Sequence, residues 1–160
     1  MRNNFPVTDV EIELSDTETI VSTTDLQGNI TYANTYFIAI SGYTEEELIG
    51  APQNILRHPD MPVEAFADMW ATIRSGRSWT GMVKNRCKNG DAYWVMANAT
   101  PVMENGKAVG YMSVRTKPTR AQITAAAELY RNLKAGTAGN IRLQQGMVRA
   151  TGLRGWLAAA

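Results

Sequence analysis

The residue types best suited to bind a ligand gather in one short segment, Arg57-His58-Pro59-Asp60. The guanidinium of Arg57 carries a planar fork of donors that matches phosphate oxygens, although a surface arginine paired with Asp60 explains the same pattern. His58 is the only histidine of the chain, and it can donate a hydrogen bond, ligate a metal centre or simply order its loop. Asp60 can accept from the free amides of a helix that starts near Pro62. This segment is therefore the candidate binding loop.

Aromatic side chains and carboxamides form a second set of candidates. Phe66 and Trp70 are four residues apart in a helical pattern and can line an apolar slot. Trp79 can stack on a flat ring, or it can serve only in packing at the start of a strand. A carboxamide both donates and accepts hydrogen bonds, which suits the polar edge of a heterocycle. The candidate carboxamides, each equally well explained by a turn or a strand edge, are Asn34, Asn85 and Asn98.

The composition excludes several classes of function. A chain of 160 residues with 44% hydrophobic and 19% charged residues is one globular domain with an appendage. The net charge of +1 argues against binding to nucleic acid through the whole surface. A single cysteine, Cys87, and a single histidine exclude cysteine-rich zinc sites and multi-histidine metal centres. The chain has no phosphate-binding loop and no nucleophile paired with a base, so it is not expected to be an enzyme.

Charge is distributed unevenly along the chain. Residues 1–116 hold nine basic and fourteen acidic side chains, whereas residues 117–160 hold seven basic and one acidic. The shift falls at Lys117-Pro118 and predicts a boundary there. The basic tail is either a solvated extension or a segment that lies near an anionic surface such as the cytoplasmic face of a membrane. We expect no signal peptide and no membrane span, because the first residues are acidic and no apolar run approaches eighteen residues.

The elements that would position these side chains follow from periodicity and turn chemistry. Capping boxes at Thr44/Glu47 and Thr119/Gln122 each predict the start of a helix, and Asn89-Gly90 predicts a hairpin turn. Strands are predicted over residues 20–24, 30–32, 78–87, 92–103 and 109–116. Helices are predicted over residues 33–40, 44–50, 62–76 and 121–134.

The order of these elements defines the fold class. Two strands, several short helices and a three-stranded meander predict an α+β fold, with one antiparallel five-stranded sheet and the helices packed over one face. A C-terminal helix and a basic tail follow. We expect an N-terminal arm over residues 1–18, which we predict to be mobile, a sensory domain over 19–118, and a helix with a linker tail over 119–160.

This element order resembles that of PAS domains, and local motifs agree with the resemblance. They are Thr24 to Asn34, the Ser-Gly-Tyr-Thr-Glu-Glu-Glu-Leu-Ile-Gly run over residues 41–50, and the hairpin over residues 88–94. The stretches over residues 57–62, 66–70, 79–86 and 110–116 resemble more narrowly the FAD-binding sensory domains of bacterial aerotaxis receptors (Aer type). The narrower likeness extends from about Thr23 to the Gly-Trp-Leu run at 155–157.

The resemblance implies a function and a set of ligand contacts. Members of this family bind FAD without a covalent bond, read redox state and through it oxygen, and control a chemotaxis kinase. The family's flavin contacts fall on Arg57, His58, Asp60 and Trp79, and by position on the three carboxamides. Arg115 stands on the last strand, near the place of the glutamine that contacts the ring in PAS photoreceptors. The implied partners are a homodimer or receptor oligomer and a signalling module of the HAMP or kinase-control type, in the cytoplasm at the inner face of the membrane.

The chain departs from the PAS photoreceptors at Arg115 and in the short helix before the binding loop, and two alternative functions remain open. The photoreceptors use a cysteine in the short helix before the binding loop, and residues 53–56 contain none, so light-driven adduct formation is not expected. A haem-binding PAS domain that senses oxygen would use His58 as the axial ligand. A PAS domain without a cofactor would only dimerise or dock a partner.

Overall fold

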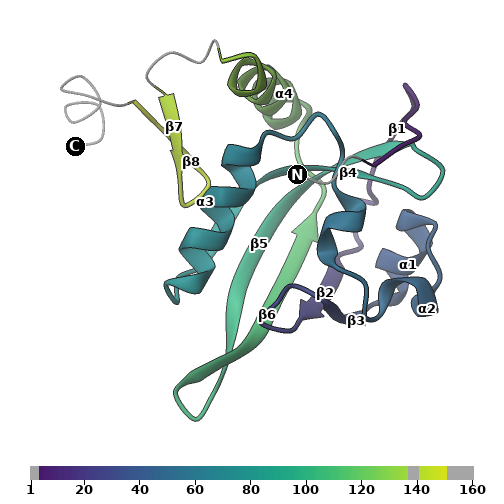
Figure 1. Cartoon of the computed structure of the whole chain (residues 1–160). Coiled ribbons are helices and arrows are strands. Elements are labelled where there is room, and N and C mark those ends of the chain that lie inside the picture. Colours follow the sequence, from purple (N-terminus) through teal and green to yellow (C-terminus); the bar gives the residue numbers. More distant parts are fainter. Residues whose placement is uncertain (1–3, 137–140, 151–160) are drawn as a thin grey trace.

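The computed structural model describes residues 4–136 and 141–150 (Figure 1). Its main feature is a twisted sheet that contains β2 (Ile20–Thr24), β3 (Ile30–Ala33), β4 (Trp79–Arg86), β5 (Ala92–Glu104) and β6 (Lys107–Thr116). The order along the sheet is β5-β6-β2-β3, and β4 pairs with the other side of β5. These five strands are antiparallel to their neighbours, as predicted.

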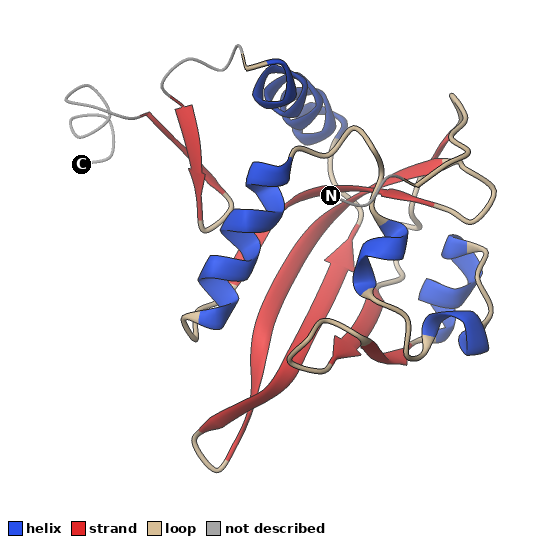
Figure 2. Ribbon diagram, in the orientation of Figure 1, coloured by secondary structure: helices blue, strands red, loops and turns tan. Residues whose placement is uncertain are grey.

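Short helices between β3 and β4 cover one face of the sheet (Figure 2). They are α1 (Thr35–Ser41), α2 (Glu45–Leu48), the 3-10 helix η1 (Gln53–Leu56) and α3 (Val63–Arg74). A longer helix, α4 (Arg120–Ala135), follows the last strand of the sheet. Both predicted capping boxes are present, at Thr44 and Thr119. The predicted α+β class with helices over one face is therefore confirmed.

The N-terminal segment is packed against the domain, which differs from the mobile arm that we expected. The strand β1 (Glu11–Ile12) pairs in parallel with the start of β5, so the complete sheet is mixed. Leu14 is only 3% exposed and joins the hydrophobic core. The amide of Thr8 donates to the carbonyl of Gly90. Sequence periodicity did not predict that this segment packs on the domain. Backbone hydrogen bonds and single side chains hold it, rather than a repeating apolar face.

The C-terminal region contains an element that the sequence did not predict. The strands β7 (Ile141–Gln144) and β8 (Met147–Ala150) form a separate hairpin. Its turn residues Gln145 and Gly146 both have positive φ, at 53° and 83°, as the two central residues of a tight hairpin turn require. The apolar run at residues 155–157 lies outside the described residues. No helix in the described ranges is long and apolar enough to cross a membrane.

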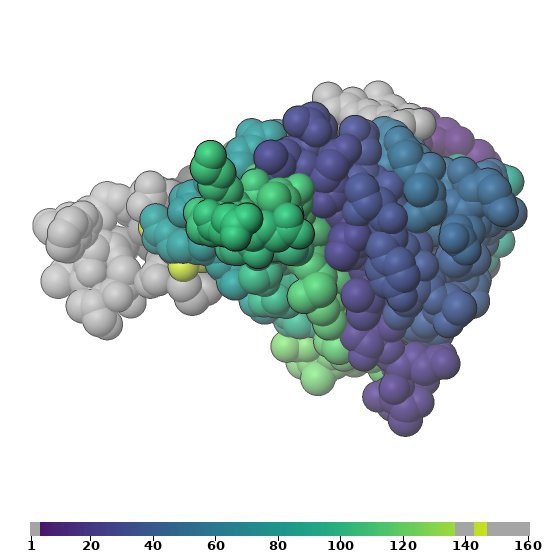
Figure 3. All heavy atoms as spheres, turned by 90° about the horizontal axis from the view of Figure 1, so that it is seen from below, coloured from purple at the N-terminus to yellow at the C-terminus, as the bar shows by residue number. Residues whose placement is uncertain are grey.

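The far ends of β5 and β6 extend from the body of the domain and lie beside the turn between β2 and β3. Figure 3 shows this region from below, with residues near 100–110 in green next to residues near 25–30 in purple. The approach is close, because a Cβ at Gly110 would overlap the carbonyl oxygen of Thr24. Glycine at this position therefore lets β6 and the end of β2 pack backbone to backbone.

Candidate functional site

A cavity of about 280 Å³ lies between the covering helices and the inner face of the sheet. Tyr93 and Val95 fill the inner face of β5 at one end of the strand, and both are fully buried. Ala97 and Ala99 continue the same face with small side chains and line the cavity. Opposite them, α3 contributes Phe66, Met69, Trp70, Ile73 and Arg74 to the cavity wall. The hollow therefore exists where the inner residues of β5 become small.

Polar residues also line this apolar slot, and several of them lie opposite α3. Gln53 and Arg57 come from η1 and the residue after it, Asn85 from β4, and Ser113 and Arg115 from β6. Among the described residues, four buried side-chain atoms have no hydrogen-bond partner: Gln53 Oε1, Arg57 Nε, Arg115 Nε and the Tyr93 hydroxyl. Three of these four atoms belong to residues that line the cavity. Because buried polar atoms are rarely left unpaired, their concentration here fits a polar ligand in the slot.

Arg115 is the most unusual of these groups. Its side chain is 3% exposed, donates to the hydroxyl of Ser22 and stacks 4.6 Å above the ring of Phe37. Burial lowers its pKa to about 10, so the guanidinium remains charged at neutral pH. No carboxylate in the described part of the chain pairs with it. A buried cation without a counter-charge favours a ligand that carries or acquires negative charge.

The candidates that the sequence singled out divide into two groups. Arg57, Phe66, Trp70, Asn85 and Arg115 line the cavity. Arg57 stacks 3.8 Å above the ring of Phe66, and burial lowers its pKa. The structure places the remaining candidates elsewhere than in the cavity wall: Asn34, His58, Asp60, Trp79 and Asn98.

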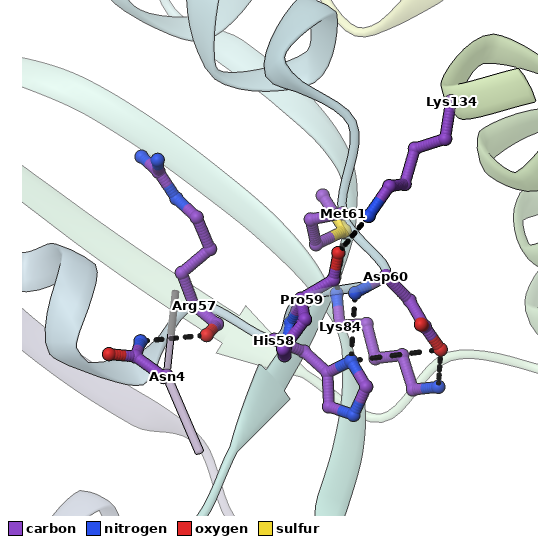
Figure 4. A network of polar contacts seen from close by, with 8 residues as sticks. All are labelled: Asn4, Arg57, His58, Pro59, Asp60, Met61, Lys84 and Lys134. Carbon is purple, nitrogen blue, oxygen red and sulfur yellow. Dashed lines mark hydrogen bonds and ion pairs between the residues drawn. The ribbon is translucent and has the colours of Figure 1, made fainter. Parts of the chain in front are cut away.

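His58 and Asp60 fasten the binding loop to β4 (Figure 4). The amide of Asp60 donates to His58 Nδ1 over 3.1 Å, and the Asp60 carboxylate pairs with Lys84 at 2.8 Å. Burial lowers the pKa of His58 to about 4, so its ring is neutral and its 3.7 Å approach to Asp60 is not an ion pair at neutral pH. Burial of the Asp60 carboxyl opposes ionisation, but the hydrogen bond and charge of Lys84 outweigh it and lower the pKa.

The backbone of the loop completes this attachment. The amide of His58 donates to the carbonyl of Lys84, and the amide of Lys84 donates to Met61 Sδ over 3.3 Å. Arg57 itself forms an antiparallel bridge with Asn85. The ordering role considered for His58 in the sequence is therefore the one that the geometry supports, and its effect is to hold Arg57 and Asn85 side by side at the cavity.

The other three side chains have structural partners. Asn34 caps α1 by accepting from the amide of Phe37, and its own amide group donates to the carbonyl of Thr19. Asn98 is exposed and donates to the hydroxyl of Thr80. Trp79 is 1% exposed, and its indole N–H donates to Asp68 over 2.8 Å.

Sequence reasoning missed several lining residues. Gln53 was noted only as part of a segment that lacks cysteine, yet it brings an unpaired carboxamide oxygen to the site. Ala97 and Ala99 lie on the same face of their strand as Tyr93 and Val95, and their small size is the signal that this face leaves a hollow. Ser113 and Tyr111 alternate with outward residues on the last strand, so the two-residue period of β6 could have identified them.

Comparisons with known proteins agree with this architecture. A family profile described as PAS fold matches residues 30–115. The chain is 52% identical over 94% of its length to the aerotaxis receptor of Escherichia coli strain K12, and 31% identical over 59% of its length to the nitrogen fixation regulatory protein of Klebsiella pneumoniae. It spans 29% and 19% of the lengths of these two relatives.

A solved structure with a similar fold is that of a light-oxygen-voltage domain studied with a flavin analogue, with a TM-score of 0.60 and 22% identity. The match covers 71% of this chain and 86% of the other. The resemblances predicted from sequence motifs, to PAS domains and to aerotaxis receptors, are confirmed by these matches. On its sequence motifs, its fold and the family profile, the chain belongs to the PAS-fold family.

Proposed function

We propose that this domain binds FAD and reports redox state, and through it oxygen or respiratory electron flow, to a chemotaxis output. The observation that carries the proposal is the cavity with its unpaired buried polar atoms and the uncompensated charge of Arg115. The identity to a protein named aerotaxis receptor supports the choice of output, and the structural likeness to a domain studied with a flavin analogue supports the choice of ligand class.

The lining residues fit an isoalloxazine ring, which is flat and apolar with polar edges. Phe66, Trp70 and Val83 provide apolar surfaces, while Ala97 and Ala99 leave the room for a ring. The groups that would hold the polar edges are Gln53, Asn85 and Arg115, because carboxamides and a guanidinium supply the required donors and acceptors. Arg57 would hold the pyrophosphate, since its fork matches phosphate oxygens.

A bound flavin supplies reversible uptake of electrons. Arg115 would stabilise the negative charge that reduction adds, because its cation is buried in a site of low dielectric. It connects the cavity to the rest of the sheet through Ser22 on β2 and Phe37 on α1. A change in what Arg115 donates to therefore alters contacts between β6, β2 and α1 without any catalytic step, which makes the domain a reporter rather than an enzyme.

The setting of the domain is part of the proposal. We propose that residues 19–118 form the sensory unit and that residues 119–160 join it to a signalling module of the HAMP or kinase-control type. The whole would act as a dimer or receptor oligomer in the cytoplasm, with the basic tail near the inner face of the membrane. The identity to an aerotaxis receptor over most of this chain supports this arrangement.

An absorption spectrum of the full chain tests the function. We expect a blue-absorbing flavin band that bleaches with dithionite, and FAD in the extract of the denatured protein. Replacing Arg115 with Gln should lower the reduction potential by about 60 mV or more, the change that corresponds to a tenfold shift of a one-electron equilibrium. A folded protein without colour would contradict the proposal, as would an unchanged potential for the proposed role of Arg115.

A haem-binding domain is the alternative that the same spectrum tests, because haem gives a sharp Soret band instead. The geometry favours flavin over haem. His58 is the only histidine of the chain, does not line the cavity, and already accepts the amide of Asp60 at Nδ1.

A further inference from the structure

One carboxylate of the domain accepts two hydrogen bonds from the C-terminal hairpin β7–β8. The backbone amides of Gln145 and Gly146, in the turn of the hairpin, donate to the two oxygens of Asp68 over 2.7 and 2.6 Å. Trp79 donates its indole N–H to the same side chain. Asp68 therefore joins α3, the start of β4 and a turn that lies 77 residues further along the chain.

The hairpin turn is shaped for this contact. A Cβ at Gly146 would overlap the carbonyl oxygen of Thr80, so only glycine lets the turn reach the edge of β4. Gly146 also has a φ of 83°, which side chains other than glycine rarely adopt. Leu143 of β7 packs against the hydrophobic core and adds an apolar contact to the polar one. The docked position is thus specified by a carboxylate, a glycine and a leucine.

Asp68 belongs to the same helix that covers the cavity. Its neighbours Phe66, Met69 and Trp70 line the cavity, whereas Asp68 does not. The hydroxyl of Thr72 donates to the carbonyl of Asp68, and Thr72 is buried. Because α3 is a continuous helix of twelve residues, a shift of its cavity-lining side moves the carboxylate as well.

We propose that Asp68 is a latch that docks the hairpin β7–β8 on the sensory domain, and that α3 transmits a change in the cavity to this hairpin. The first part stands on the contacts alone. The second part rests on the proposed function, because it takes the flavin as the source of the change. The hairpin follows α4, the helix that leaves the sheet. In the proposed receptor, its docked or released state therefore lies between the cavity and the signalling module.

The physical basis is the pair of hydrogen bonds that the hairpin turn donates to one carboxylate. Charge-assisted bonds from backbone amides to a carboxylate are stronger than neutral ones, and here two of them converge on one side chain. Replacing Asp68 with Asn removes the charge and puts an amino group in the place of one acceptor. The two hairpin amides and the indole then compete for a single neutral oxygen, and the hairpin opens more often.

Amide hydrogen exchange on the full chain tests the latch. We expect the amides of Gln145 and Gly146 to exchange at least tenfold faster in Asp68→Asn than in the wild type, while amides of the central strands keep their protection. Glu64→Gln is the matched control, since Glu64 is an exposed acid on the same helix. Equal exchange of the two hairpin amides in all three proteins would overturn the latch.

A second variant changes the hairpin turn rather than α3. Gly146→Ala leaves Asp68 and α3 intact but places a methyl group against Thr80. We expect it to release the hairpin as Asp68→Asn does, without loss of protection in β5 or β6. If Asp68→Asn fails to fold, this variant decides, because unchanged exchange at Gln145 would exclude the docked turn.

Reduction of the bound flavin tests whether α3 transmits a change in the cavity to the hairpin. In the wild type with bound flavin, dithionite should change the exchange rate of the Gln145 and Gly146 amides several-fold, and in Asp68→Asn it should not. An unchanged rate in a yellow wild type would overturn transmission while leaving the latch in place. A colourless wild type would remove the proposed function and transmission together, and the exchange of Asp68→Asn in that protein would still decide the latch.

Discussion

At the scale of single residues, His58 and Asp60 hold the binding loop against β4 and do not line the cavity. A direct contact of either residue with a flavin stays a prediction from the sequence resemblance, and in the structure the amide of His58 and the carboxylate of Asp60 both contact Lys84 on β4. The buried ring of His58 accepts a backbone amide at Nδ1, a role that only the neutral form can fill. The loop is therefore sensitive to acid through its own backbone contact.

The first prediction concerns the pH dependence of stability. His58 has a pKa of about 4 in the folded protein and an ordinary value of 6.5. Between these values the unfolded chain binds a proton that the folded one does not. The free energy of unfolding should thus fall as the pH drops from 6.5 to 4, by about 2–3 kcal/mol from this residue.

Urea denaturation of the wild type and of His58→Asn at several pH values measures this term. The asparagine carbonyl can still accept the amide two residues ahead, but it cannot be protonated. The variant should lose less stability than the wild type between pH 6.5 and 4. Parallel losses in the two proteins would show that His58 is not the titrating group.

At the scale of elements, the strand β5 sets the size of the cavity. Its inner face changes from Tyr93 and Val95 to Ala97 and Ala99, and the space that the alanines leave is the proposed ring site. The outer face of the same strand carries Asn98, which is exposed. The two-residue period of the strand therefore separates positions that should control binding from positions that should not.

The second prediction fills the cavity. Ala99→Leu should reduce flavin content at least tenfold, because the added side chain occupies space that the ring needs, while the strand and the sheet remain. Asn98→Leu puts the same side chain on the outer face and should leave flavin content within twofold of the wild type. Flavin absorbance per mole of purified protein measures both. Full occupancy in Ala99→Leu would place the ring elsewhere.

Most elements of the fold could be predicted, because each has a local signal. Capping boxes fixed the starts of α2 and α4, and Asn89-Gly90 fixed the hairpin between β4 and β5. Of the residues predicted for the site, Arg57, Phe66, Trp70, Asn85 and Arg115 line the cavity. The motif residues His58 and Asp60 lie near the cavity but outside its wall, because whether a loop side chain faces a cavity depends on tertiary contacts such as those with Lys84. The hairpin β7–β8 was missed because its docking depends on Asp68, which is far away in the sequence.

At the scale of the whole molecule, α4 and the sheet form a joint between the sensory unit and the C-terminal region. Tyr130 is buried, stacks on Trp94 at a centroid distance of 6.2 Å and donates its hydroxyl to the carbonyl of Met82 over 2.7 Å. Burial raises the pKa of Tyr130, so the hydroxyl remains a donor throughout the physiological range. One aromatic residue thus fixes the helix to two strands.

The third prediction tests this joint. Tyr130→Phe keeps the ring stacked but leaves the carbonyl of Met82 without its donor, which should lower the free energy of unfolding by about 1–3 kcal/mol. Tyr32→Phe, at an exposed tyrosine of β3, should change it by no more than about 0.5 kcal/mol. Chemical denaturation followed by circular dichroism compares them. Equal stability of the two variants would mean that the hydroxyl of Tyr130 contributes nothing measurable.

The covered edge of β4 has a consequence for assembly. In the described part of the chain β4 pairs with no strand but β5 and makes a single bridge to Arg57, and an edge strand of this kind can recruit a strand from another molecule. Here the carbonyls of Met82 and Lys84 accept from Tyr130 and His58, and the turn at Gly146 sits against Thr80. A foreign strand would have to displace a helix, a loop and a hairpin at once. The covering of this border therefore disfavours polymerisation of the sheet through β4.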